Sequence, residues 1–436
     1  MRSYFIRRLL LIPLTLLGVT FVVFALTRIL PGGPLEQRMQ KAMMAQEGHS
    51  AGRSLAQASV LNEDQLIALK RSFLLDKPLV PAFLMWWGII PSEVMHRDAT
   101  EIPLPQGEEK SSAKEIFLPM RGADGSLVSK KARIFVDRDQ MLSLQLEDGS
   151  TPEGWHVRQE GATTGGGEGG GPREIHAVAY RTKFAGVLQW EFRNSLTMGD
   201  PVWSLIRERF PISLFYGIIT MILTYCICIP LGVLKAIKHR TFIDSASSVG
   251  IFLGYSIPGF ALGTILVLLF AFRIELFPIG GFTSEQCDSL PLAGKIKDLA
   301  HHAVLPLICY LIGAFAMTTM LMKNSLLDNL AADYVRTAVA KGSSFSRSVI
   351  GHAMRNSLIP IGTTFGQNIT LLVGGSMLIE TVFDIFGFGL LGYNALVDRD
   401  YTITLAIIFL SGLLMMVGNV LSDLIVAWLN PRIRFE

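Results

Sequence analysis

The sequence predicts an all-α membrane protein of about six transmembrane helices, with an inserted, β-containing module outside the membrane. Half of the 436 residues are hydrophobic and 17% are charged, which is far from the balance of a soluble domain of this size. The apolar residues gather in blocks of about 18 residues or more, the length that a helix needs to cross a bilayer. Residues 35–200 contain no such block, so we expect this part of the chain to lie in water.

The first expected span is the apolar run 9–30, which follows Arg2, Arg7 and Arg8. A signal peptide is the alternative interpretation of this run. The apolar region of a signal peptide usually has about 7–15 residues and ends at a small-residue cleavage site. Here the run is longer and ends in Pro-Gly-Gly-Pro, so we expect residues 1–34 to form an uncleaved first transmembrane helix.

Five further apolar blocks are expected to form a core membrane domain over residues 201–436. They cover residues 212–234, 245–272, 303–322, 359–378 and 403–429. Pro230 and Pro258 lie inside the second and third spans and are expected to kink them, because proline removes a helical hydrogen bond.

Basic residues between the spans predict the orientation of the chain, because Lys and Arg are enriched in short cytoplasmic loops. They gather in four segments: Arg2, Arg7 and Arg8 at the N-terminus; Lys235, Lys238 and Arg240 after the second span; Lys323, Arg336, Lys341, Arg347 and Arg355 after the fourth; and Arg432 and Arg434 in the tail. The other short loops hold fewer basic residues, mixed with more acidic ones. We therefore expect both termini in the cytoplasm and residues 31–210 outside.

Residues 35–200 are expected to form an extracytoplasmic region with an inserted module at about residues 90–183. Between Ile116 and Leu146, runs of the sequence alternate apolar and polar residues and end in Asp-Gly pairs. This pattern is typical of half-exposed strands that are joined by turns. The Gly-rich run 163–172 offers no packing surface and is expected to be a mobile linker.

Residues 61–87 begin with an Asn-capped amphipathic helix and end in Trp86 and Trp87. This tryptophan pair fits a lipid interface and the core of the outer region about equally well.

The most informative segment is the loop between the fourth and fifth spans, residues 333–360. Its Ala- and Val-rich start predicts a short helix over 333–340 that ends at Gly342, and Ser346 is expected to cap a second helix. The second helix carries a polar face of Arg347, His352, Arg355 and Asn356, and Pro360 fits the first turn of the next span. Two roles are open: a basic loop held by anionic lipid, or a rigid helix pair that transmits the motion of a soluble motor.

The loop resembles a known element. Ala338, Ala340, Lys341 and Gly342, followed by His352, Arg355, Asn356 and Pro360, resemble the coupling loop of binding-protein-dependent ABC importer permeases. Other segments are similar to the peptide branch of that family: YFIRRLLLIPLTLLGVTFVVF, RILPGGP, LDKPL, HHAVLPL, GGSMLIETVFDIFGFGLLGYNALVDRDYTI and NPRIRF. The resemblance covers residues 1 to about 90 and 184–436, and its nearest members carry peptides and microcin C-like peptide conjugates.

Two features depart from the family pattern. Gly33 stands where an Asp is usual, and the stretch of about 100 residues between Trp87 and Phe184 is not expected in a typical member. These departures leave the role of the inserted module open.

The resemblance implies the type I ABC importer permease fold, a multi-pass protein of the cell inner membrane, and a path for peptides or peptide-like solutes. It implies as partners a second permease, two cytoplasmic ATPases that bind ATP and Mg²⁺, and an extracytoplasmic substrate-binding protein; no nucleic acid is expected. The sequence has no G-x-x-x-x-G-K-[ST] loop, so we expect no enzyme activity and no cofactor on this chain. A permease for another solute, such as nickel or a sugar, is the alternative.

Three polar residues near the middle of the fifth span are candidates for the translocation path: Gln367, Asn368 and Thr370. Polar groups are costly against lipid, so they face a cavity or form hydrogen bonds to other helices. At the outer end of this span, Glu380 and Asp384 are candidates for contact with a binding protein, although simple solvation of a helix end explains them as well.

Other classes of membrane protein fit less well. An ion-driven secondary transporter usually needs ionisable residues at mid-membrane depth, and none occurs in the middle of a predicted span. A membrane enzyme is disfavoured because H-E-x-x-H and G-x-S-x-G inside a span are absent, and His301 and His302 are adjacent and point apart. The four cysteines are expected to be buried hydrophobes and one free thiol, and Cys226 and Cys228 point apart on a helix, which disfavours a shared metal.

Overall fold

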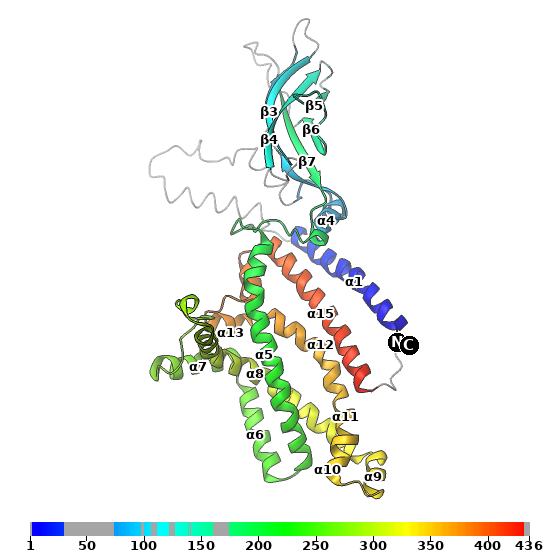
Figure 1. Cartoon of the computed structure of the whole chain (residues 1–436), viewed down its shortest axis with the longest axis vertical. Helices are drawn as coiled ribbons and strands as arrows, with labels where there is room; N and C mark the ends of the chain where they lie inside the picture. The colour runs from blue at the N-terminus through cyan, green and yellow to red at the C-terminus, as the bar shows by residue number, and fades with distance from the viewer. Residues whose placement is uncertain are drawn as a thin grey trace. The chain divides into compact units, whose positions relative to one another are not determined.

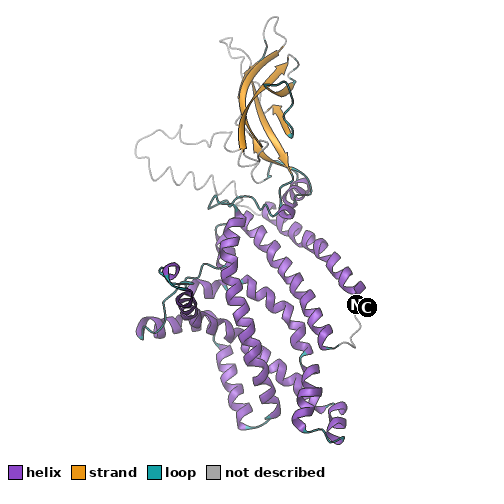
Figure 2. Cartoon of the chain, in the orientation of Figure 1, coloured by secondary structure: helices purple, strands orange, loops and turns teal. Residues whose placement is uncertain are grey.

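The computed structural model describes residues 2–29, 74–96, 100–105, 111–121, 127–137, 139, 141–159 and 174–430. The chain divides into two compact units, one made of Met1–Leu66 and Phe192–Glu436 and the other of Ile67–Glu191. Figure 2 shows that the long helices belong to the first unit and the strands to the second. The predicted combination of membrane helices with a β-containing insertion is therefore confirmed.

Four described helices are long and apolar enough to cross a membrane. They are α1 (Arg2–Ile29), α5 (Val202–Ile237), α8 (Leu292–Ala331) and α15 (Tyr401–Leu429). A further candidate is a bent pair, in which α6 (Phe242–Ser256) is followed at 90° by α7 (Gly259–Leu266) and the π-helical turn η2 (Val267–Arg273). At the predicted fifth span, α12 (Ile359–Gly374) has 16 residues and is followed by α13 (Met377–Val382) and α14 (Phe388–Val397).

The two predicted proline kinks have different outcomes. Pro258 stands at the break between α6 and α7, and the preceding Ile257 is extended, with φ −95° and ψ 120°. A proline disfavours helical conformation in the residue before it, so the helix stops there and a new one starts. By contrast, α5 continues through Pro230 without a break.

Glycines let α12 and α15 pack side by side, as Figure 1 shows. A Cβ atom added to Gly366 would lie 2.5 Å from the carbonyl oxygen of Gly418, so neither helix tolerates a side chain at the crossing. Ser422 Oγ donates hydrogen bonds to the carbonyls of Gly362 and Thr363, the latter at 2.9 Å. Small residues four apart are a common means of close helix packing in membranes.

The first helix is tied to the last by polar side chains. Arg8 of α1 forms an ion pair with Asp423 of α15, and Tyr4 Oη donates to the same carboxylate at 3.0 Å. From the sequence, Arg8 was interpreted only as a signal for membrane orientation. In the structure it also has an ion-pair partner within the fold.

The second unit holds two antiparallel sheets. Its strands are β1 (Ser92–His96), β2 (Thr100–Pro103), β3 (Ser111–Arg121), β4 (Leu127–Asp137), β5 (Leu142–Leu146), β6 (Trp155–Gln159) and β7 (Glu174–Lys183). One sheet has the order β1-β7-β2, with β6 also paired to β7, and the other has the order β3-β4-β5. Both sheets contribute to one apolar core, which includes Ile102, Leu118, Ile134, Trp155 and Ile175.

Trp86 and Trp87 are buried. Both lie in α4 (Leu79–Trp87) and are only 4% exposed, and the ring of Phe83 stacks on Trp86 at a centroid distance of 6.2 Å. Both tryptophans are therefore covered by other parts of the protein. The Gly-rich run 163–172, residues 61–73 of the predicted amphipathic helix, Gly33 and the tail 431–436 lie outside the described residues.

Candidate functional site

The loop between α8 and α12 folds as a compact chain of short helices, which we call the elbow (residues 333–357). It consists of α9 (Asp333–Ala340), α10 (Phe345–Ser348), the π-helical turn η4 (Val349–Ala353) and α11 (Met354–Ser357). The predicted pair of short helices is present. The second helix starts at Phe345 with Ser344 at the N-cap position, two residues before the predicted Ser346.

Gly342 ends the first helix in a left-handed conformation, with φ +89°. Its N–H donates to the carbonyl of Val339 at 2.9 Å, and the N–H of Ser343 donates to that of Ala338 at 3.1 Å. These two bonds form a Schellman motif, which satisfies carbonyls that the end of a helix leaves free. The backbone at Ala338 and Gly342 therefore fixes the angle of the elbow, while Ala340 and Lys341 are exposed.

Arg355 and Asn356 hold the elbow to neighbouring elements. Arg355 Nε donates to the carbonyl of Leu429 at 2.7 Å and Nη2 to that of Trp428 at 3.3 Å, so the guanidinium caps the end of α15. Asn356 Nδ2 donates to Tyr334 Oη at 3.1 Å, which links α11 to α9. Pro360 lies in the first turn of α12, as predicted from its missing N–H.

The inner side of the elbow packs on three long helices. Val335, Val349 and Ala353 of the elbow are buried in one apolar cluster with Ala236 of α5, Met322 and Leu326 of α8 and Ile361 of α12. The elbow therefore shares one close-packed core with these helices, and close-packed side chains yield little.

The outer side of the elbow exposes large apolar side chains. Tyr334, Val339, Phe345 and Ile350 are 41%, 44%, 53% and 68% exposed. Lys341 and His352 are exposed among them. The sequence did not single out these large apolar residues, because such residues fit the core of a short helix pair equally well. A mixed apolar and basic surface on a rigid element is typical of a protein contact.

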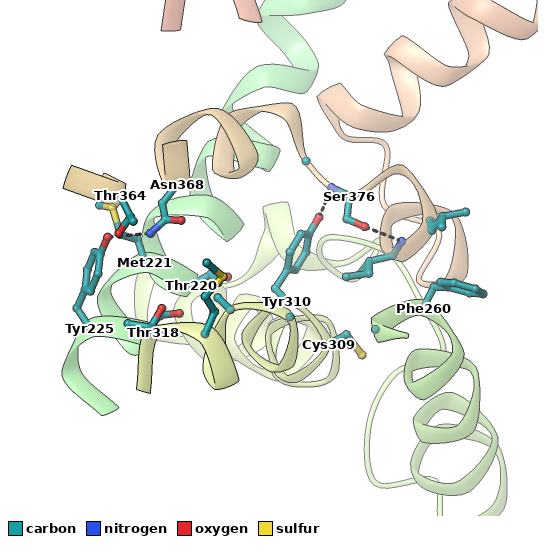
Figure 3. Close-up of a pocket in the computed structure, with 18 of the residues that line it drawn as sticks. Thr220, Met221, Tyr225, Phe260, Cys309, Tyr310, Thr318, Thr364, Asn368 and Ser376 are labelled. Atoms are coloured by element: carbon teal, nitrogen blue, oxygen red, sulfur yellow. Dashed lines mark hydrogen bonds between the residues drawn. The ribbon is translucent and has the colours of Figure 1, made fainter. Parts of the chain in front are cut away.

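A cavity of about 560 Å³ lies in the first unit, lined by residues of α5, α7, α8, α12 and α13. Asn368 is the one predicted path residue that the structure places on it, and Figure 3 shows its amide beside Tyr225. Asn368 Nδ2 donates to Tyr225 Oη at 2.9 Å, and the N–H of Ser376 donates to Tyr310 Oη at 3.1 Å. Gln367 and Thr370 lie in the same helix, but their side chains are outside the described part of the structure.

The lining of this cavity is uncharged. It combines apolar groups with hydroxyls from Thr220, Thr224, Thr318, Thr364 and Ser376 and with the two tyrosines. Such a wall offers neutral hydrogen-bond donors and acceptors but no ion-pair partner to a solute.

The expectation that Glu380 contacts a binding protein or solvent is wrong, because the side chain is only 1% exposed. Its Oε1 accepts a hydrogen bond from Ser213 Oγ at 3.0 Å, and its Oε2 accepts one from the N–H of Leu390 at 2.6 Å. The carboxylate thus satisfies the start of α14 and cannot contact a protein from outside. Asp384 is exposed, as expected.

Sequence analysis also missed a buried ionic cluster. Lys235 and Lys323, which were assigned to basic loops, lie inside α5 and α8, and both contact the carboxylate of Asp244 in α6. The pattern gave no signal for this cluster, since the partners are 9 and 79 residues from Asp244 along the chain.

Comparisons with known proteins agree on one family. Residues 228–435 match the family described as binding-protein-dependent transport system inner membrane component. The chain is 39% identical over 252 residues to the peptidoglycan transport system permease protein YejB of Agrobacterium fabrum, which covers 57% of this chain and 69% of that protein. It is 34% identical over 259 residues to the oligopeptide transport system permease protein AppB of Bacillus subtilis, and the match covers 59% of this chain and 80% of that protein. It is also 34% identical over 268 residues to the dipeptide transport system permease protein DppB of Escherichia coli K12, and the match covers 58% of this chain and 79% of that protein.

Proposed function

Because the chain belongs to the family of binding-protein-dependent transport system inner membrane components, in which it is a permease subunit of an ABC importer, we propose that it carries peptides or peptide-like solutes. The observation that carries this proposal is that three relatives at 34–39% identity are named for oligopeptide, dipeptide and peptidoglycan transport. The uncharged cavity supports it, since the main chain of a peptide is itself a series of neutral donors and acceptors.

We propose that the elbow docks on a cytoplasmic ATPase. The exposed Tyr334, Val339, Phe345 and Ile350 supply apolar contact area, and Lys341 and His352 supply polar contacts at its rim. Gly342 and the carbonyl of Ala338 set the angle of the elbow, and Arg355 and Asn356 hold it in place. Closure of the ATPases then moves a rigid element whose inner side is packed on α5, α8 and α12.

This assignment includes the partners and orientation that the sequence predicts. A second permease, two ATPases with ATP and Mg²⁺, and an extracytoplasmic binding protein complete the complex. Both termini and the elbow then lie in the cytoplasm, and the strands between Ser92 and Lys183 lie outside. The first transmembrane helix and the five spans of the core surround the solute path, and Asn368 stands on it, with Gln367 and Thr370 as further candidates.

Uptake by proteoliposomes tests the function. The complex of both permeases and ATPases is reconstituted, a purified binding protein is added outside, and ATP is enclosed. We expect ATP-dependent accumulation of labelled short peptides, and no accumulation without the binding protein. Uptake of nickel ion or a labelled disaccharide, with no uptake of peptides, would overturn the peptide assignment.

A further inference from the structure

Asp244 lies between two lysines from two other helices. Lys323 Nζ is 2.7 Å from Asp244 Oδ1 and 2.8 Å from Oδ2, and Lys235 Nζ is 3.1 Å from Oδ1. Lys235, Asp244 and Lys323 are 0%, 4% and 7% exposed. Through this cluster, α6 is bonded to both α5 and α8.

Among the residues that the structure describes, the charged groups of the cluster all have polar partners within the protein. Lys235 Nζ also donates to the carbonyl of Asp244 at 2.9 Å and to the hydroxyls of Ser247 and Ser248 at 2.8 and 2.7 Å. Asp244 Oδ2 further accepts a bond from the N–H of Arg240 at 3.2 Å and lies 3.3 Å from His239 Nδ1. Buried charges add little net stability compared with apolar side chains of similar size, so stability alone gives no reason for this arrangement.

On one side, the cluster borders the packing surface of the elbow. Ala236 follows Lys235 and Met322 precedes Lys323, and both belong to the apolar cluster that holds Val335 and Val349. A movement of the elbow therefore displaces the backbone that carries both lysines.

On the other side, the cluster leads to the cavity. Asp244 is in the first turn of α6, and this helix ends at the 90° break before Pro258. Gly259 and Phe260, which follow the break, line the cavity. A 15-residue helix moves as a stiff rod, so a shift at Asp244 reaches the break and the cavity wall beyond it.

We propose that Asp244, held between Lys235 and Lys323, is the positioning residue that transmits movement of the elbow to α6 and to the cavity wall at Phe260. This inference rests on the proposed docking of the elbow on an ATPase. The two ion pairs tie α6 to α5 and α8 at defined atoms, because charge-assisted hydrogen bonds are short and strong.

Two substitutions separate this role from a merely structural one. Lys323→Met and Lys235→Met each remove one lysine and leave the other paired with Asp244, so neither variant leaves an uncompensated buried charge in the cluster. The matched control is Arg8→Met, which breaks an ion pair between α1 and α15, helices that carry neither the elbow nor residues of the cavity wall.

The test is the number of peptides imported per ATP hydrolysed, measured in proteoliposomes for the full complex with its binding protein. We expect hydrolysis within about twofold of wild type and a ratio lowered roughly tenfold in both lysine variants, the size typical of a coupling between sites. The ratio should be unchanged in Arg8→Met.

Three results would overturn the inference: an unchanged ratio in both lysine variants, an equal loss in Arg8→Met, or failure of both lysine variants to assemble, which would assign the cluster to stability. A wild-type complex whose hydrolysis ignores peptide and binding protein would instead overturn the proposed function itself, and the inference with it.

Discussion

Ser195 Oγ donates a 2.6 Å hydrogen bond to the carboxylate of Asp400, which lies 205 residues further along the chain. Asp400 is fully buried, and its Oδ2 also accepts bonds from the N–H and the hydroxyl of Thr197, each at 3.1 Å. Its Oδ1 accepts from the N–H of Ile403 at 3.2 Å, which makes Asp400 the N-cap of α15. One side chain thus starts the last membrane helix and fastens the segment before α5 to it.

We expect Asp400→Ala to lower the free energy of unfolding by about 2–4 kcal/mol, because it removes an N-cap and leaves several buried donors without an acceptor. The measurement is the thermal unfolding of the purified permease in detergent. Asp398→Ala is the control, since Asp398 is exposed two residues away, and it should change the unfolding temperature little. Equal effects of the two substitutions would contradict the assigned role of Asp400.

Gly342→Val should uncouple the ATPases from the binding protein. A β-branched residue at φ +89° is strained, so the elbow would lose its angle. We expect peptide-loaded binding protein to stimulate ATP hydrolysis at least about fivefold less than in wild type, the lower end of typical coupling between sites.

Gly351→Val is the matched control for this experiment. Gly351 is also in the elbow and also has open space around its Cα, but its φ is not positive. If both valine variants lose stimulation to the same extent, added bulk at the docking surface explains the loss and the backbone argument fails.

Arg355→Ala should destabilise the junction of the elbow with α15. It removes the two hydrogen bonds to the carbonyls of Leu429 and Trp428, for an expected cost of about 0.5–1.5 kcal/mol, since the donor is charged but exposed to water. Arg347→Ala, an exposed arginine of the same elbow, should cost less than about 0.5 kcal/mol in the same thermal unfolding assay. An Arg355→Ala variant as stable as wild type would refute this structural role.

Gly366→Ala should weaken the packing of α12 on α15, because the new methyl group would overlap the backbone of Gly418. We expect a loss of about 1–3 kcal/mol, as for other overpacked positions. Gly250→Ala is the control, since nothing lies within 4 Å of a Cβ at that position. If the two variants have the same free energy of unfolding in detergent, then α12 and α15 accommodate the methyl group by moving apart without a loss of stability, and the prediction is wrong.

Features that depend on neighbouring residues could be predicted from the sequence. Apolar blocks located the membrane helices, and Gly342 marked the end of α9, because chain length across a bilayer and left-handed backbone conformation are local requirements. The hydropathy pattern did not give the full length of α8, which has 40 residues, since its polar ends leave the apolar block.

Features that depend on tertiary pairing could not be predicted. Lys235 and Lys323 have the sequence context of loop residues, and only packing brings Asp244 between them. Glu380 follows an apolar block as a solvated helix end would, but the chain returns over it and buries it under the start of α14. In both cases the charge of the side chain suggested exposure to solvent, whereas in the fold the side chain is buried with polar partners.

In the second unit, the first strand pairs with the last, and Ser92 lies opposite Lys183. The polypeptide therefore leaves this small fold beside the point where it came in, at the spacing of neighbouring antiparallel strands. A short loop could join the same two points, so the strands from Ser92 to Lys183 form a closed excursion of the chain.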